Sequence, residues 1–93
     1  MAIKTFKCAD TEALVGLRRV ARFANIERPA LHKLKQLDLA RRFEDLRAPP
    51  ANRLEQLKGD RAGQWRIRVN DQFRICFRWT GNDAEDVEIV DHH

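Results

Sequence analysis

The sequence has few of the residues that mark disordered, disulfide-bonded or membrane-spanning chains. Only four glycines and three prolines occur in 93 residues, and 43% of the residues are hydrophobic, a composition typical of an ordered globular fold. The two cysteines, Cys8 and Cys76, lie too far apart for a metal-binding or redox motif, so we interpret both as packing residues in a reducing compartment. No apolar run approaches the roughly 18–20 residues of a membrane span.

The N-terminus also lacks the features of a secretory signal. Lys4 and Lys7 interrupt its short apolar run, whereas a signal peptide needs a continuous hydrophobic stretch. We therefore expect a cytoplasmic protein. Residues 1–93 are expected to form a single domain, because a chain of this length holds only one hydrophobic core.

Positive charge is concentrated in one part of the chain. Eighteen lysines and arginines against fourteen acids give a net charge of +4. Residues 61–79 contain five arginines and one acid, Asp71, so the net charge of this segment equals that of the whole chain. A local positive charge of this kind favours an anionic partner.

The first part of the chain predicts a short strand and then a helix. Residues 2–7 alternate apolar and polar side chains, with Ile3 and Phe6 near the ends of the expected strand. Asp10 or Thr11 is placed to cap the following helix. Its apolar positions at helical spacing are Leu14, Leu17 and Ala21.

A second helix is expected to begin near Pro29, because proline lacks the N–H that a first helical turn leaves unused. Its polar side is expected to carry Lys33. Its apolar stripe consists of Ala30, Leu31, Leu34 and Leu37. A further helical turn is indicated by Phe43 and Leu46, before Pro49 and Pro50 end it.

After these prolines the hydrophobic period changes from about 3.6 residues to about 2, which indicates strands. Residues 65–69 and 73–79 are predicted to form two strands, residues 80–86 a polar loop, and residues 87–90 a last strand. The expected fold class is α+β, with one small, mostly antiparallel sheet and two helices packed on one face.

The register of the central hairpin follows from its apolar residues. Keeping them on one face places Val69 opposite Phe73 and leaves residues 70–72 as the loop. Arg68 then faces Arg74, and like charges directly opposite destabilise a sheet by about several tenths of a kcal/mol. An anion between the two guanidinium groups would turn this repulsion into binding. The alternative is that both arginines spread into water beside neighbouring acids.

Two other groups have a simple structural interpretation when taken alone. Glu55 and Lys58 are three residues apart and would ordinarily be a solvated ion pair. His92 and His93 at the end of the sequence would ordinarily be frayed ends or the remnant of a purification tag.

Three segments together resemble the HigB toxins, the plasmid maintenance killer branch of the RelE superfamily. They are residues 57–61 (LKGDR), 63–79 (beginning GQW and ending NDQFRICFRW) and 87–93 (VEIVDHH). The resemblance is specific from residue 54 onward and weak in the helices. It implies a β-α-α-β-β-β toxin that binds the A site of the 70S ribosome and cleaves messenger RNA there, without a metal or other cofactor. It also implies a helix-turn-helix antitoxin of the HigA type, through which alone the toxin would meet operator DNA.

The resemblance also implies roles for individual residues. In the family, the RNA 2′-hydroxyl attacks its own 3′-phosphate and a free 5′-hydroxyl leaves. By position, Arg74 would stabilise that phosphate and Lys58 would add positive charge. His93 would be the general acid, since imidazole titrates close to neutral pH. Asp91 would orient the site.

Two candidate catalytic residues depart from the family pattern. Glu55 stands where some HigB relatives have histidine, although other toxins of the superfamily use glutamate there as a general base. His92 stands where a tyrosine is usual, and this loss predicts slower cleavage. The remaining arginines are expected to contact RNA rather than to take part in chemistry: Arg61, Arg66 and Arg68.

We therefore expect an endoribonuclease toxin that acts on ribosome-bound messenger RNA and inhibits translation. One alternative is a non-catalytic or weakly active module of the same fold that binds RNA or the ribosome. Another is an interaction protein whose basic face binds an acidic partner.

Overall fold

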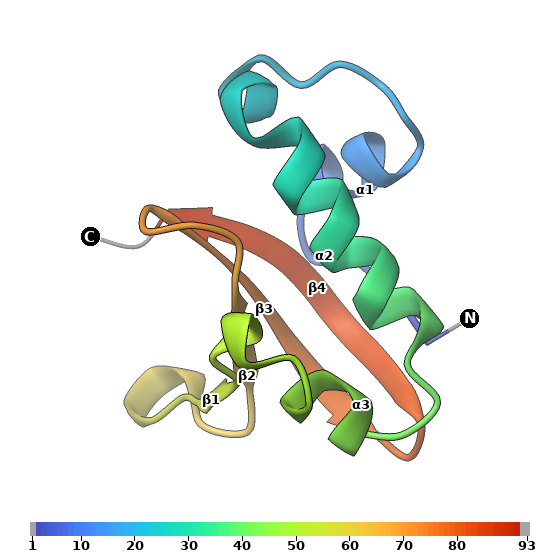
Figure 1. Cartoon of the computed structure of the whole chain (residues 1–93), viewed down its shortest axis with the longest axis vertical. Helices are drawn as coiled ribbons and strands as arrows, with labels where there is room; N and C mark the ends of the chain where they lie inside the picture. Colours follow the sequence, from blue (N-terminus) through green and yellow to red (C-terminus); the bar gives the residue numbers. More distant parts are fainter. Residues whose placement is uncertain (1, 92–93) are drawn as a thin grey trace.

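The computed structural model describes residues 2–91 and contains one four-stranded antiparallel sheet with helices against one face (Figure 1). The strands lie in the order β1-β2-β3-β4. This arrangement confirms the α+β fold class. The elements are α1 (Ala9–Val15), the 3-10 helix η1 (Ala21–Ile26), α2 (Glu27–Leu39), α3 (Glu44–Arg47), the 3-10 helix η2 (Pro50–Asn52), β1 (Glu55–Gln56), the 3-10 helix η3 (Gly59–Arg61), β2 (Trp65–Arg68), β3 (Phe73–Thr80) and β4 (Asp83–Asp91).

The core forms between α2 and the apolar face of the sheet, and in Figure 1 α2 runs alongside β4. The predicted apolar stripe of α2 is buried at Ala30, Leu34 and Leu37. It packs against strand side chains that are themselves fully buried: Ile67, Ile75, Phe77 and Val87. No helix in the described part of the chain is long and apolar enough to cross a membrane.

The predicted register of the β2–β3 hairpin is confirmed. The facing pairs are Trp65 with Phe77, Ile67 with Ile75, and Arg68 with Arg74. The N–H of Val69 donates to the carbonyl of Phe73 at 3.0 Å, as the expected loop requires. Asn70 stabilises this loop, because its Oδ1 accepts the N–H groups of Gln72 at 2.9 Å and Phe73 at 2.7 Å.

Two strand predictions need correction. Residues 2–7 form two isolated parallel bridges with β4, Ile3 with Ala84 and Phe6 with Val87, rather than a continuous strand. The polar loop predicted for residues 80–86 is wrong, because β3 continues to Thr80 and β4 begins at Asp83. The segment is polar because its charged residues lie on the solvated side, while Ala84 is fully buried.

The first helix is shorter than predicted. It ends at Val15 with Gly16 as the C-cap, so Leu17 lies outside it, with a left-handed backbone (φ 63°) and a side chain that is 80% exposed. Neither Asp10 nor Thr11 caps it, because the N-cap residue is Cys8. Thr11 is buried instead, and its Oγ1 accepts the N–H of Ile89 in β4 at 3.0 Å.

Candidate anion-binding site

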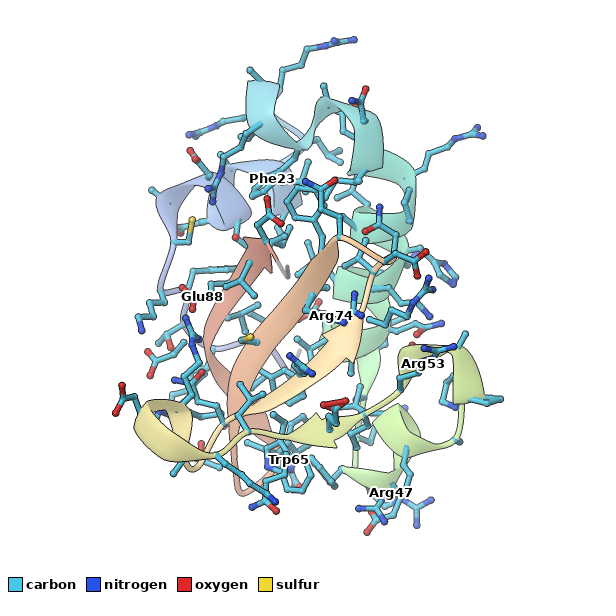
Figure 2. The ribbon with its side chains drawn as sticks, turned by 90° about the vertical axis from the view of Figure 1, so that its left-hand side faces the viewer. Phe23, Arg47, Arg53, Trp65, Arg74 and Glu88 are labelled. Carbon is cyan, nitrogen blue, oxygen red and sulfur yellow. The ribbon has the colours of Figure 1, made fainter. Side chains whose placement is uncertain are left out.

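The predicted arginine pair lies on the polar face of the sheet, near the loop of the β2–β3 hairpin. Figure 2 shows its member on β3, Arg74. Arg68 faces Arg74, and Arg66 lies one pair further along the same face. Burial, together with the charges of Arg66 and Arg68, lowers the pKa of Arg74. Guanidinium groups nevertheless stay protonated in proteins. The repulsion must therefore be balanced by anions.

The guanidinium of Arg74 is held in place by the hairpin loop. Its Nη1 donates to the carbonyl oxygens of Asn70 and Phe73, the latter at 3.1 Å. The other guanidinium nitrogens of Arg74 have no hydrogen-bond partner within residues 2–91. Arg74 is thus both oriented and able to donate further hydrogen bonds to a bound anion.

The carboxylate of Asp71 is an internal anion of this site. Its Oδ1 accepts a hydrogen bond from Nη2 of Arg68 at 2.5 Å. This bond, together with the charges of Arg68, Arg53 and Arg74, lowers the pKa of Asp71. The Asp71 side chain is 98% exposed, and exposed ion pairs contribute little to stability. A phosphate group could therefore replace this carboxylate without disturbing the core.

Strand β1, which the sequence did not reveal, positions Glu55. It pairs with β2 so that Glu55 lies opposite Arg66, and Oε2 of Glu55 accepts a hydrogen bond from Nη2 of Arg66 at 2.6 Å. The charge of Glu55 also acts on Arg74. The structure therefore brings the predicted acid and the predicted arginines into one neighbourhood.

The candidates that precede β2 are placed differently. Lys58 is exposed, and its side chain forms no hydrogen bond or ion pair within residues 2–91. Arg61 donates from Nη1 to Glu88 Oε1 at 2.9 Å and to Gln64 Oε1 at 3.0 Å. The hydrogen bond to Glu88 raises the pKa of Arg61. Arg61 is thus already neutralised by β4, and its contact with RNA stays a prediction.

The last strand ends beside the arginine pair. Asp91 lies opposite Phe73, the residue before Arg74, and its Oδ2 accepts a hydrogen bond from Nε2 of Gln72 at 3.2 Å. Figure 1 shows the end of β4 next to the β2–β3 loop. The roles predicted for His92 and His93 fall outside the described residues. No group of three potential metal ligands occurs between residues 2 and 91.

Two cations that sequence reasoning missed, Lys33 and Arg53, adjoin the pair. Nζ of Lys33 donates to Oδ1 of Asn52 at 2.6 Å, and burial and the charge of Arg68 lower the pKa of Lys33. Arg53 follows η2 and acts on Asp71. Helical periodicity assigned Lys33 to the solvated side of α2, and no motif marks Arg53, so no signal in the sequence identified either.

Replacing Asp71 with asparagine is expected to strengthen anion binding. The variant removes the carboxylate that competes for Arg68, and we expect the Kd for a short 2′-O-methyl RNA to fall by up to about fivefold at 0.1 M salt. Fluorescence anisotropy measures this Kd. Glu12→Gln, an exposed change on α1 with the same charge difference, is the matched control. Equal affinities of the two variants would show that Asp71 does not occupy the anion site.

Comparison with known proteins shows the family of this chain and its fold. The structure resembles that of a YoeB/ParE toxin from Agrobacterium tumefaciens, with a TM-score of 0.58, 20% identity and full coverage of both chains. Residues 18–93 match the family described as RelE-like toxin of type II toxin-antitoxin system HigB. The chain belongs to this family of toxins, whose partner is a protein antitoxin.

Two relatives illustrate the similarity. Toxin HigB-1 from Vibrio cholerae is 41% identical over 69 residues, which cover 74% of this chain and 73% of that protein. Endoribonuclease HigB from Proteus vulgaris is 34% identical over 61 residues, which cover 66% of this chain and 65% of that protein. The match to the family model includes the whole of the arginine-rich hairpin.

Proposed function

We propose that this toxin is an endoribonuclease that cleaves messenger RNA on the 70S ribosome and thereby inhibits translation in the cytoplasm. The observation that carries the proposal is the convergence of Glu55 with Arg66, Arg68 and Arg74 at one end of the hairpin. The name of the relative from Proteus vulgaris supports the same activity.

The proposed reaction is an attack of an RNA 2′-oxygen on the adjacent phosphorus. The bond from this oxygen to phosphorus forms as the bond from phosphorus to the 5′-oxygen breaks, leaving a cyclic phosphate and a 5′-hydroxyl. Glu55 takes the 2′-hydroxyl proton, because Arg66 holds its Oε2 and its Oε1 has no hydrogen-bond partner among residues 2–91.

The remaining groups stabilise charge and supply a proton. Arg74, together with Lys58, stabilises the negative charge that gathers on the phosphate oxygens during the attack. His93 protonates the departing 5′-oxygen, and Asp91 orients the neighbouring groups. Arg66 and Arg68 hold the RNA backbone.

The exposure of the site supports dependence on the ribosome. The side chain of Glu55 is 55% exposed and that of Asp71 is 98% exposed. A site this open does not by itself hold a flexible strand in line for attack, and precise alignment supplies a large part of the rate of such reactions. The ribosome provides this alignment.

A helix-turn-helix antitoxin of the HigA type is the proposed partner, and it alone contacts operator DNA.

Mapping of RNA ends in a cell-free translation system tests the proposed function. Addition of the toxin should create 5′-hydroxyl ends within messages that are bound to ribosomes, and few in free RNA. A 2′-deoxy substitution at the mapped nucleotide should abolish cleavage there, because it removes the nucleophile. Ribosome binding without cleavage at long incubation would contradict the proposal. That result would favour the alternative of a non-catalytic binding module, which is suggested by His92 at the position where the family usually has tyrosine.

A further inference from the structure

Beside the arginine pair, a second cationic corner lies along β2. Strand β1 pairs with Trp65 and Arg66. Beyond these residues, the flank of β2 is approached by η2 and by a side chain of α2. Three cations come to this flank from separate elements: Lys33 from α2, Arg53 from the residue after η2, and Arg68 from β2. Arg68 acts on Lys33, and both Arg53 and Arg68 act on Asp71.

Lys33 is held in this corner by a buried polar contact. Its Nζ donates to Oδ1 of Asn52 at 2.6 Å, and Nδ2 of Asn52 donates to the carbonyl of Leu46 at 3.1 Å. Asn52 is fully buried, so its position is determined by the core. An ammonium group has three N–H donors, and Asn52 uses one. Lys33 therefore points at a fixed place with donors to spare.

Arg68 presents an unused donor to the same region. Its Nη2 is bonded to Asp71, whereas its Nε is buried and has no hydrogen-bond partner among residues 2–91. A buried donor without a partner is uncommon in native proteins, because it loses water and gains nothing in return. A bound acceptor would remove this cost.

Arg53 completes the corner from the chain that leads into β1. Its backbone is left-handed (φ 46°, ψ 53°), a conformation that residues with side chains adopt at a cost. Its side chain forms no hydrogen bond or ion pair within the described residues, yet its charge acts on Asp71. Figure 2 shows Arg53 on this chain segment and Arg74 on β3 from one side of the molecule.

We propose that Lys33, Arg53 and Arg68 bind a second phosphate of the RNA backbone, next to the phosphate that Arg74 holds. This inference rests on the proposed function, which assigns the reacting phosphate to Arg74. The phosphodiester oxygens accept hydrogen bonds from Nζ of Lys33, Nε of Arg68 and the guanidinium of Arg53. Such a contact identifies no base. It determines the register of the strand, and so which 2′-hydroxyl lies beside Glu55.

The test measures the Kd of the toxin for an uncleavable RNA in which each phosphate is neutralised in turn. The probe is a fluorescent 2′-O-methyl hexanucleotide, in a series in which a neutral methylphosphonate replaces one phosphate at a time. Lys33→Gln and Arg53→Gln should each raise the Kd for the fully charged probe about fivefold at 0.1 M salt, the effect of losing one phosphate contact on a single strand. A methylphosphonate at one particular position should weaken binding by the wild type by the same factor. At that position it should not weaken binding by the two variants any further.

The matched control is Lys35→Gln, an exposed residue of α2 with the same change in charge. It should bind every probe as the wild type does. Arg53 is exposed and lies outside the core, so Arg53→Gln tests the subsite even if Lys33→Gln unfolds. Wild-type affinity of folded Arg53→Gln at every position would overturn the subsite. Equal weakening of all three variants, without dependence on position, would also overturn it.

The failure of the subsite can be told apart from failure of the proposed function. Cleavage by the wild type on ribosomes, combined with unchanged binding by Arg53→Gln, rejects the subsite alone. Position-specific binding without cleavage rejects the endoribonuclease and leaves a phosphate site of a binding module.

Discussion

Replacing Arg74 with alanine is expected to slow messenger RNA cleavage by about 10²–10³-fold, the usual effect of removing a group that stabilises charge in a transition state. Arg74 is the residue whose guanidinium the loop carbonyls orient, and the charge of Glu55 acts on it. Single-turnover cleavage on programmed ribosomes, with mapping of the 5′ ends, measures the rate. Arg74→Lys should retain part of the activity, because lysine keeps the charge but not the two-pronged hydrogen bonding.

This substitution should leave the protein folded. Alanine removes the repulsion between positions 68 and 74, and Arg74 makes no ion pair within residues 2–91 that would be lost with it. Thermal unfolding checks this point. Arg78→Ala is the matched control, because Arg78 lies on the same strand. Its Nε forms an ion pair with Oδ2 of Asp86 at 3.4 Å. Full activity of Arg74→Ala would reject the assigned site, and a comparable loss in Arg78→Ala would reject its specificity.

Replacing His93 with glutamine is expected to slow cleavage by about 10²–10⁴-fold, the contribution of a general acid. A general acid must be protonated, and an imidazole ordinarily loses its proton near neutral pH, so the wild-type rate should fall as the pH rises. The variant should lose that part of the profile, because glutamine does not titrate. A pH–rate series for both proteins, measured under single-turnover conditions, tests the prediction.

A change in the leaving group separates proton donation from other roles of His93. Sulfur in place of the bridging 5′-oxygen leaves as a thiolate and does not need a proton. His93→Gln should therefore cleave this substrate almost as fast as the wild type does. The control is His32→Gln, an exposed residue of α2 outside the site, which should behave as the wild type on both substrates. A variant that stays slow on the sulfur substrate would show that His93 is not the acid.

The arginine-rich hairpin could be predicted because its two strands obey one simple rule. Their apolar residues alternate, and only one register keeps those residues together, so the pairing of Arg68 with Arg74 follows from the sequence alone. The stripe of α2 follows from the same reasoning at helical spacing. In both elements the buried face determines the arrangement.

The rest of the site could not be predicted because it depends on tertiary contacts. Strand β1 contains only two residues, too few for any period to show, yet it brings Glu55 to Arg66. In the sequence, Lys33 has the spacing of an ordinary solvated lysine. Its hydrogen bond to the buried Asn52 depends on the tertiary fold. The mistaken loop at residues 80–86 has a related cause, since a strand with one solvated side can be mostly polar.

The N-terminal segment and β4 depend on each other across almost the whole length of the chain. Ile3 pairs with Ala84, and Thr11 accepts the N–H of Ile89, 78 residues away. A chain interrupted before residue 83 has no partner for its first residues and lacks the strand beside β3. Incomplete copies should therefore be harmless. The active fold of the toxin thus requires β4, and a premature stop codon anywhere before residue 83 should relieve toxicity.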